Sequence, residues 1–202
     1  DSYGSTFRKY DWIYKVRDRY QAYASLNPIK PYRFIREVNE GRNFIYENYL
    51  FNHHSNSVIS WRKLARKKPM KKDTVALPGD CNYDVLTMIY HARNIDFSKA
   101  EVDDLLPIRI FIDNESHESY IRYLGKQELR VKGLGTFRCI VFSPLLIEGT
   151  IFNAGEGMTV WVTDDANKVP LLVETPILVG SIRARVNKME GLRHPLNSKL
   201  AD

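Results

Sequence analysis

The sequence predicts a mainly β fold: a curved antiparallel sheet or open half-barrel of about eight to ten strands with one packed α-helix. Three observations lead to this fold class. Tyr, Phe and Trp make up 12% of the residues, and aromatic side chains suit strands on a half-buried pleated surface. Turn-forming segments recur at short intervals through the second half of the chain, which is typical of meandering strands. Only residues 83–93 show a clear helical repeat of apolar side chains.

The first half of the chain has the pattern of strands separated by turns. The predicted elements are a strand over residues 10–24, a hairpin over residues 32–52 that turns at Glu40-Gly41, and a strand over residues 57–62. In the first strand, Trp12, Tyr14 and Val16 alternate with Lys15 and Arg17, which is the two-residue period of β structure.

The second half begins with the helix and continues as a β-meander. Asp80 or Asn82 is expected to cap a helix that begins near Tyr83 and ends near Arg93. The meander is predicted between residues 107 and 188, with turns at residues 113–116, 132–135, 153–157 and 164–168. The last six residues, NSKLAD, are polar and are expected to fray.

The length of the chain favours a single domain over residues 1–202. A chain of 23.5 kDa can bury roughly 70% of the surface that its unfolded form exposes. No apolar run approaches the ~18 residues that a membrane-spanning helix needs, which excludes an integral membrane protein of the helical type.

The net charge is +6, and Lys and Arg are spread along the chain as well as clustered, so charge alone does not identify a partner. The densest cluster covers residues 62–72, where seven of eleven residues are basic. We expect this segment to be an exposed, solvated loop. The alternative is an interaction module that binds polyanions, namely acidic lipid headgroups, polysaccharide or nucleic acid, through Arg66, Lys67, Lys68, Lys71 and Lys72. Apart from Trp61 the segment lacks aromatic residues that would stack on bases, so nucleic acid is not the expected partner, whereas peripheral membrane contact is compatible with it.

No motif ties residue types to a particular reaction, and we therefore predict a protein that is not an enzyme and holds no metal or cofactor. Asp84 and His91 share one helix face, which suits a weak metal pair or a base with its orienting carboxylate, but no third ligand accompanies them. Cys81 and Cys139 are too few for a zinc site, and free buried thiols are favoured over a disulfide. The remaining histidines are interpreted as structural or incidental, and the Asp-Asp pairs as turn formers; these are His53, His54, His117, His194, Asp103-Asp104 and Asp164-Asp165.

Two stretches of the C-terminal half carry a resemblance to a known family. They are FSPLLIEGTIF (residues 142–152) and MTVWVTDDANKVPLLVETPILVGSIRARV (residues 158–186). Their signature is a strand ending Trp-x-Thr-Asp-Asp, a turn closed by Pro170, and a Gly180-Ser181 pair before the last strand. Together with YKVRDRYQAYA, PYRFIREVNEG and YDVLTMIYHAR, these stretches resemble the bacterial domain of unknown function 3108 family, particularly its Bacteroidetes versions.

The resemblance implies a location and a fold, but no catalytic residues. Members of the family are generally exported, with a signal peptide or lipoprotein-type leader in the precursor, which implies a periplasmic or other cell-envelope protein. They also carry further strands before the point that corresponds to Asp1, so the resemblance leaves open whether residues 1–202 are the whole domain. The sheet is similar to the half-barrels of periplasmic lipoprotein carriers, which hold acyl chains on a concave apolar face.

That similarity leads to a second hypothesis, in which the concave face of the sheet binds a lipid or other hydrophobic molecule. The candidate side chains for such a face are Trp12, Tyr14, Phe34, Tyr46, Trp161, Leu172 and Ile182. The simpler interpretation is ordinary core packing, because the apolar faces of strands in a small barrel or sandwich fill one another. The sequence does not define the oligomeric state.

Overall fold

The chain divides into two compact units. A computed structural model describes residues 1–79, 82–147, 155–176 and 181–201. Unit 1 consists of residues 1–91 and 109–117, and unit 2 consists of residues 92–108 and 118–202. The expectation that the chain forms one domain stays a prediction.

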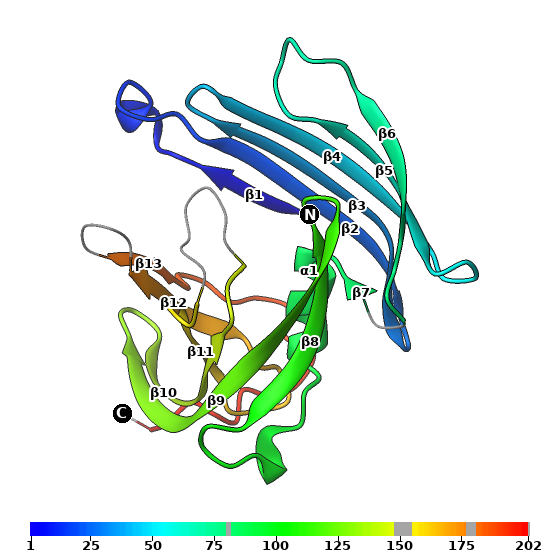
Figure 1. The fold of residues 1–202 in the computed structure, drawn as a ribbon. Coiled ribbons are helices and arrows are strands. Elements are labelled where there is room, and N and C mark those ends of the chain that lie inside the picture. Colours follow the sequence, from blue (N-terminus) through cyan, green and yellow to red (C-terminus); the bar gives the residue numbers. More distant parts are fainter. Residues whose placement is uncertain (80–81, 148–154, 177–180, 202) are drawn as a thin grey trace. The chain divides into compact units, whose positions relative to one another are not determined.

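Unit 1 is built on a six-stranded antiparallel sheet in which each strand pairs with the next one in sequence (Figure 1). Its strands are β1 (Ser2–Ser5), β2 (Arg17–Leu26), β3 (Ile29–Glu40), β4 (Asn43–Asn52), β5 (Ser57–Lys63) and β6 (Lys71–Ala76). The hairpin predicted over residues 32–52 is confirmed with its turn after Glu40, and so is the strand predicted over residues 57–62. Side chains alternate across this meander, so one face of β3 buries Phe34 and Val38.

The strand predicted over residues 10–24 begins only at Arg17, so this prediction is wrong for its first seven residues. Residues 8–10 form a short 3₁₀ helix, η1, and the chain then turns before it enters β2. The alternation of Trp12, Tyr14 and Val16 is therefore not a strand period. Polar side chains decide the local structure instead, because Thr6 and Asp11 bond to Arg17 and close a loop.

The core of unit 1 lies on one face of the six-stranded sheet. Phe34, Tyr49, Phe51 and Val58 come from the sheet, and Phe111 comes from β8 (Leu105–Ile112), whose second half belongs to this unit. The ring centroids of Tyr49 and Phe111 are 5.0 Å apart in an edge-on contact. Each buried ring of this kind stabilises the fold by about 2 kcal/mol.

One α-helix, α1 (Val85–Ala92), packs its first turn against this core, as the sequence predicts. Its cap differs from the expectation. Asp84 accepts hydrogen bonds from the backbone N–H groups of Leu86 and Thr87 at 2.9 and 3.0 Å, so Asp84 is the N-cap. Asn82 lies in β7 (Asn82–Tyr83), where its amide donates to the carbonyl of Gly79. Asp80 lies outside the described residues.

Unit 2 contains most of a seven-stranded sheet in the order β13-β12-β11-β10-β9-β8-β7. Its remaining strands are β9 (Glu115–Val131), β10 (Gly135–Pro144), β11 (Thr159–Thr163), β12 (Pro170–Pro176) and β13 (Ser181–Arg185). From β9 to β13 neighbouring strands pair antiparallel, whereas β7 pairs with β8 in parallel. A second 3₁₀ helix, η2 (Phe97–Lys99), precedes β8. The core of this unit gathers Val131, Phe137, Cys139, Val141 and Leu171.

The predicted fold class is confirmed: the structure is mainly β, with antiparallel sheets that are not closed into a barrel. The described residues contain thirteen strands rather than about eight to ten, since the chain forms two sheets instead of one. The turns predicted at residues 113–116, 132–135 and 164–168 separate strands as expected. Of the turn predicted at 153–157, residues 153 and 154 lie outside the described residues, and residues 155–157 precede β11 without being part of a named strand. No helix in the described ranges has the length and apolar character needed to span a membrane.

The expectation that the C-terminal tail frays is wrong. Ser198 is fully buried, and its hydroxyl donates a 2.6 Å hydrogen bond to Asp165. The backbone N–H of Arg138 donates to the carbonyl of Ser198, and that of Leu200 donates to the carbonyl of Thr136. The tail thus bonds to the start of β10, although its composition is polar.

Candidate functional site: the loop end of unit 1

Three connections of the six-stranded sheet lie at the same end of it. In an antiparallel meander every second connection returns to the same end, and here these are the β1–β2 loop (residues 6–16), the β3–β4 turn (residues 41–42) and the β5–β6 loop (residues 64–70). Figure 1 shows the three connections together at the upper end of the blue and teal strands. We call this group of connections the loop end.

Direct contacts join the three connections into one surface. The backbone N–H of Gly41 donates to the carbonyl of Lys15 at 2.8 Å, which ties the first loop to the turn. The Arg66 guanidinium donates to the side chain of Asn39 at 2.6 Å and lies 4.9 Å from the centre of the Phe44 ring. The second loop is thereby fixed to the hairpin that carries the turn, so the loop end is continuous across the sheet.

The loop end is strongly basic. Its exposed basic side chains, with those on the adjoining first residues of β6, are Arg8, Lys9, Lys15, Arg42, Arg66, Lys67, Lys68, Lys71 and Lys72. Of the acidic side chains nearby, Asp11 is paired with Arg17 at 2.6 Å and Glu40 is buried. Among the described residues, none of the nine cations has an ion-pair partner within 4 Å.

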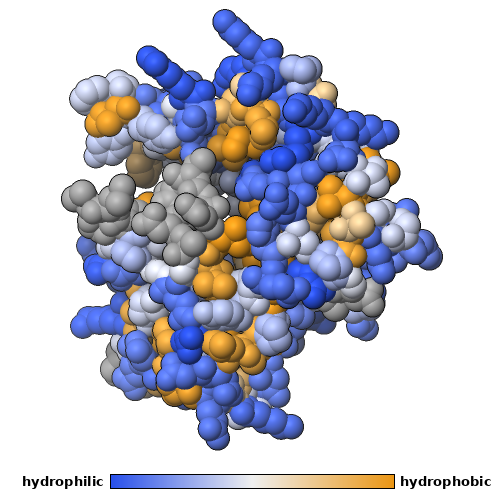
Figure 2. Space-filling model, in the orientation of Figure 1, coloured by the Kyte–Doolittle hydropathy of each residue, from blue (hydrophilic) through white to orange (hydrophobic). Residues whose placement is uncertain are grey.

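The excess of basic over acidic residues is also confined to unit 1, the unit that contains the loop end. Unit 1 contains 17 Lys and Arg residues against 11 Asp and Glu, whereas unit 2 contains 13 of each. The whole net charge of +6 therefore belongs to unit 1. Figure 2 shows hydrophilic side chains projecting where the loop end lies in Figure 1, with smaller hydrophobic patches among them.

The sequence predicts part of this site. The exposed loop expected over residues 62–72 is present as residues 64–70, and the five candidate cations Arg66, Lys67, Lys68, Lys71 and Lys72 are all exposed. Lys71 and Lys72 belong to β6 rather than to the loop. Sequence reasoning misses Arg8, Lys9, Lys15 and Arg42, because only strand pairing brings these separate residues to the same end.

Arg62 is an exception among the basic residues of this segment, because it turns inward. Its Nε lies 2.6 Å from Oε1 of Glu47, a residue with no exposed side-chain surface. Arg36 Nε lies 2.9 Å from the other oxygen of Glu47, an ion pair whose angle falls outside hydrogen-bond range, and Arg36 also bonds to Asp113. Burial opposes the charge of Arg36, but Glu47 and Asp113 outweigh it and raise the pKa of the guanidinium. This buried charge cluster joins β3, β4 and β5 to the β8–β9 turn.

The seven candidates for an apolar ligand face are divided between the two units, four in unit 1 and three in unit 2, and those of unit 1 do not share one face of its sheet. Trp12 and Tyr14 are exposed in the β1–β2 loop, whereas Phe34 is fully buried in the core of unit 1. Phe34 pairs with Tyr49, and side chains alternate along β4, so Tyr46 lies on the opposite face of the sheet. The other three belong to unit 2: Trp161 is half-buried on β11, Leu172 is buried on β12, and Ile182 is exposed on β13.

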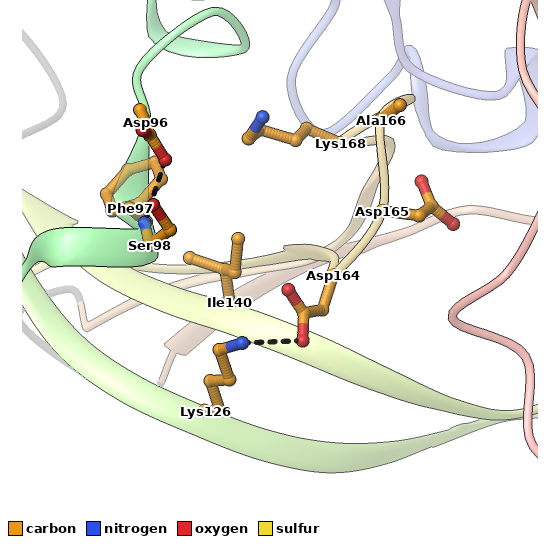
Figure 3. A pocket seen from close by; sticks show the side chains of 9 residues that line it. All are labelled: Asp96, Phe97, Ser98, Lys126, Ile140, Asp164, Asp165, Ala166 and Lys168. Atoms are coloured by element: carbon orange, nitrogen blue, oxygen red, sulfur yellow. Dashed lines mark hydrogen bonds and ion pairs between the residues drawn. The ribbon is translucent and has the colours of Figure 1, made fainter.

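Unit 2 has a small depression that is lined by both polar and apolar side chains. Its volume is about 200 Å³, which is below the ~300 Å³ of a typical ligand pocket. Figure 3 shows Lys126 and Asp164 pointing toward each other across its floor, 2.9 Å apart, beside Ile140. The Asp96 carboxylate accepts a hydrogen bond from the backbone N–H of Ser98 at 2.9 Å. Among the charged side chains that line this depression, Lys126 and Asp164 pair with each other, and Asp165 accepts hydrogen bonds from Thr163, Asn167 and Ser198. Its apolar part is limited to a few side chains.

Asp84 and His91 do not form a joint site. Asp84 is fully buried as the N-cap, and His91 lies at the other end of α1, about 10 Å along the helix axis. The His91 ring stacks on Tyr83, with ring centroids 4.4 Å apart, and burial lowers the pKa of the imidazole. No cluster of three or more metal-binding side chains occurs within the described ranges.

The other polar candidates have structural contacts. Asp165 forms its turn by accepting from Thr163 and Asn167, and His53 bonds to the carbonyl of Pro31. Cys139 is a free, buried thiol, and burial raises its pKa to about 11. Cys81 lies outside the described residues.

Comparisons with known proteins add a family and a fold. A model of the family described as "Protein of unknown function (DUF3108)" matches residues 2–187. No curated protein matches the chain. Among solved structures, the chain is similar to a beta-barrel-like protein of domain of unknown function DUF1849 from Brucella abortus. The identity is 9% and the TM-score 0.40, with 85% of this chain and 86% of that chain covered.

Proposed function

The chain belongs to the DUF3108 family, and on that premise we propose that it is a non-catalytic cell-envelope protein that binds a polyanionic surface through the loop end of unit 1. The observation that carries the proposal is the set of nine exposed cations on the three joined connections and the adjoining start of β6, none of which has an ion-pair partner among the described residues. Clustered charge of one sign raises the local concentration of an oppositely charged partner and accelerates its association. A merely solubilising surface would not require the cations to lie at one end.

The affinity expected from such a site is electrostatic and therefore sensitive to salt. Cations that neutralise a polyanion release its condensed counterions, so the affinity falls steeply as salt is added. Over a distance of about 10 Å, the screening length at 0.1 M salt, neighbouring cations of the loop end act together. Retention on immobilised heparin, measured against a salt gradient, reports this binding without knowledge of the natural partner.

A variant with Lys67, Lys68, Lys71 and Lys72 changed to Gln tests the proposal. We expect it to elute from heparin at clearly lower salt and with a smaller salt dependence of its affinity. The matched control changes four exposed lysines of unit 2, Lys99, Lys132, Lys188 and Lys199, to Gln, which removes the same net charge from the molecule. If both variants elute at the same salt concentration, net charge alone determines retention and the proposed site does not exist.

The hypothesis of a hydrophobic ligand on the concave face stays a prediction with weaker support. Its candidate residues are dispersed over both units, and the depression in unit 2 is small, with a lining that is part polar and part apolar. Native mass spectrometry after mild purification, together with displacement of a fluorescent fatty acid, tests it. Co-purified lipid and saturable probe binding would favour the carrier over the polyanion-binding protein.

The proposal also includes the absence of catalysis and an exported location. In support of the first, the buried carboxylates Asp84 and Glu47 are already occupied, one by the helix N-terminus and the other by two guanidinium groups. The second follows from the family resemblance. Fractionation of the source cells, with detection by antibody, tests the location, and finding the protein in the cytoplasm would contradict it.

A further inference from the structure

The β1–β2 loop is held by two partly buried polar side chains, Thr6 and Asp11, while several large apolar side chains lie on its outside. Thr6 donates to Asp11 at 2.7 Å and accepts from the backbone N–H of Val16, while Arg17 bonds to both carboxylate oxygens of Asp11. These bonds close the loop through polar groups, and none of them involves Phe7, Trp12 or Ile13. Phe7, Trp12 and Ile13 point away from the protein, with 78%, 83% and 63% of their surface exposed.

Such exposure is unusual, because water contact of large apolar side chains is unfavourable and grows with the exposed area. Clustered apolar side chains on a surface are a typical sign of a protein or membrane contact. The β5–β6 loop has the same character on a smaller scale, since Leu64 and Met70 are about half-exposed on either side of Arg66, Lys67 and Lys68. Both loops therefore combine apolar side chains with cations.

We propose that the loop end docks on a lipid bilayer that contains anionic lipids, with Phe7, Trp12 and Ile13 entering the headgroup region. This inference rests on the proposed function and specifies its partner. Cations next to the inserted side chains, such as Arg8, Lys9 and Lys15, would then face the lipid phosphates. Aromatic side chains are favoured at this depth of a bilayer, because the ring is apolar and its polar atoms remain in contact with water.

The kinds of apolar side chain distinguish a bilayer from other polyanions. Aromatic rings stack on nucleic-acid bases and on sugar rings, but the aliphatic side chains Ile13, Leu64 and Met70 do not. A bilayer accepts both types, and it is broad enough to contact two loops on separate hairpins at once. The cation–π contact of Lys9 with Tyr10, at 4.8 Å, also places a cation next to an aromatic ring, a combination of residue types found in segments that bind at the bilayer surface.

Trp12 provides a direct probe of this proposal. The chain has two other tryptophans, which a Trp61→Phe/Trp161→Phe variant removes. We expect the fluorescence of Trp12 to shift to shorter wavelength when vesicles of phosphatidylcholine and phosphatidylglycerol in equal parts are added. Phosphatidylcholine with brominated acyl chains, included in the same vesicles, should quench it. Vesicles of phosphatidylcholine alone should bind far more weakly, because the cations then lack a counter-charge.

A triple variant tests the inserted side chains. Phe7→Ser/Trp12→Ser/Ile13→Ser, followed by co-sedimentation with the mixed vesicles, should bind about thirtyfold more weakly than the unaltered protein. The matched control is Tyr23→Ser/Leu26→Ser/Tyr32→Ser, which removes three exposed apolar side chains from the opposite end of the same sheet, Leu26 among them with 92% exposure. The control should bind vesicles as the unaltered protein does.

The outcomes separate this inference from the proposed function. Suppose that heparin retention depends on the four lysines, but that anionic vesicles neither shift nor quench the fluorescence of Trp12. The proposal of bilayer docking is then wrong, and a soluble polyanion remains as the partner. If vesicle binding is lost equally in the triple variant and in its control, the loop end is not the docking surface. If neither heparin nor vesicles distinguish the lysine variant from its control, both proposals fail. Because the Trp12 measurement leaves the loop unaltered, it stands even if the triple variant does not fold.

Discussion

At the residue scale, Glu47 is the side chain on which unit 1 depends most for charge balance. Its carboxylate has no exposed surface and is the shared partner of Arg36 and Arg62. Glu47 also affects the ionisation of the neighbouring Tyr49, because burial and the Glu47 carboxylate together raise the pKa of the phenol. An ion pair in such a place adds little to stability as a whole, but the loss of one member leaves an uncompensated buried charge.

We expect Glu47→Gln to lower the free energy of unfolding by about 3 kcal/mol, because two guanidinium groups would then share only the partly exposed Asp113. Urea denaturation measures the change. The control is Glu128→Gln, which neutralises an exposed carboxylate on β9 and should alter stability by less than about 0.5 kcal/mol. Equal effects of the two substitutions would contradict the structural role of the cluster.

Asp84 provides a second test at this scale. Asp84→Ala removes the acceptor of two backbone N–H groups and of the Thr87 hydroxyl, and it should cost about 1–2 kcal/mol of unfolding free energy. Asp84→Asn keeps one acceptor oxygen and should cost less. Asp96→Ala, which removes the exposed cap of η2, serves as the matched control. A loss no greater than that of the control would show that the buried cap does not stabilise α1.

At the element scale, the C-terminal tail is attached to the β11–β12 turn by a titratable group. Burial opposes ionisation of Asp165, but bonds from Ser198, Asn167 and Thr163 outweigh it and lower the pKa of the carboxyl from 3.8. A lowered pKa means that the fold favours the charged form. The contribution of Asp165 to stability is therefore complete above pH 3.8 and is lost as the pH falls through the lowered pKa.

We accordingly expect the tail to detach in acid before either sheet unfolds. Hydrogen exchange of the Leu200 backbone N–H, which bonds to Thr136, should lose protection below pH 3.8 while amides in the centre of β10 remain protected. In Asp165→Asn this pH dependence should disappear, whereas Asp103→Asn, at an exposed turn, should retain it. Protection of Leu200 that is independent of pH in the unaltered protein would refute the role of Asp165.

Elements with their own periodicity could be predicted from the sequence, and those held by distant partners could not. The alternation of Phe34 and Val38 and the turn after Glu40 define the β3–β4 hairpin locally. Residues 10–16 also alternate, but the bonds of Asp11 to Thr6 and Arg17 override the pattern. The tail shows the same limit, because Ser198 meets Asp165 across 33 positions of sequence.

In the candidate site, too, the residues that form a local sequence pattern could be predicted and those brought together by strand pairing could not. Basic residues that are consecutive in sequence, such as Lys67 and Lys68, mark the β5–β6 loop as exposed. Arg8 and Arg42 gave no such signal, because each is isolated in sequence and joins the group only through strand order. The exposure of Trp12 was hidden by an apparent strand period, which suggested a buried or half-buried side chain.

At the scale of the whole molecule, neither unit is a continuous stretch of chain. The tip of the β8–β9 hairpin, residues 109–117, belongs to unit 1, while the rest of both strands belongs to unit 2. The tip supplies Phe111 to the core and Asp113 to the buried charge cluster. A cut at the end of the first segment of unit 1 would therefore remove a part of its interior.

We expect a fragment of residues 1–91 to lack a cooperative unfolding transition. A fragment of residues 1–117 includes the hairpin tip and should unfold cooperatively in urea, because the loss of a buried Phe alone costs about 3–5 kcal/mol. Circular dichroism during denaturation distinguishes the two fragments. A sharp transition in the shorter fragment, with the midpoint of the longer one, would show that the tip contributes nothing to unit 1.

The position of the tip in the chain also sets an order of events during synthesis. The six strands of the first sheet leave the ribosome before Phe111 does, so Phe34, Tyr49 and Phe51 have no ring to cover them when they first meet water. At roughly 5–20 residues per second, the 26 residues from 92 to 117 take about one to five seconds to follow. During that interval the aromatic side chains on one face of the sheet are exposed to water. A chaperone or translocation factor that recognises exposed aromatic rings could bind the nascent chain at that stage.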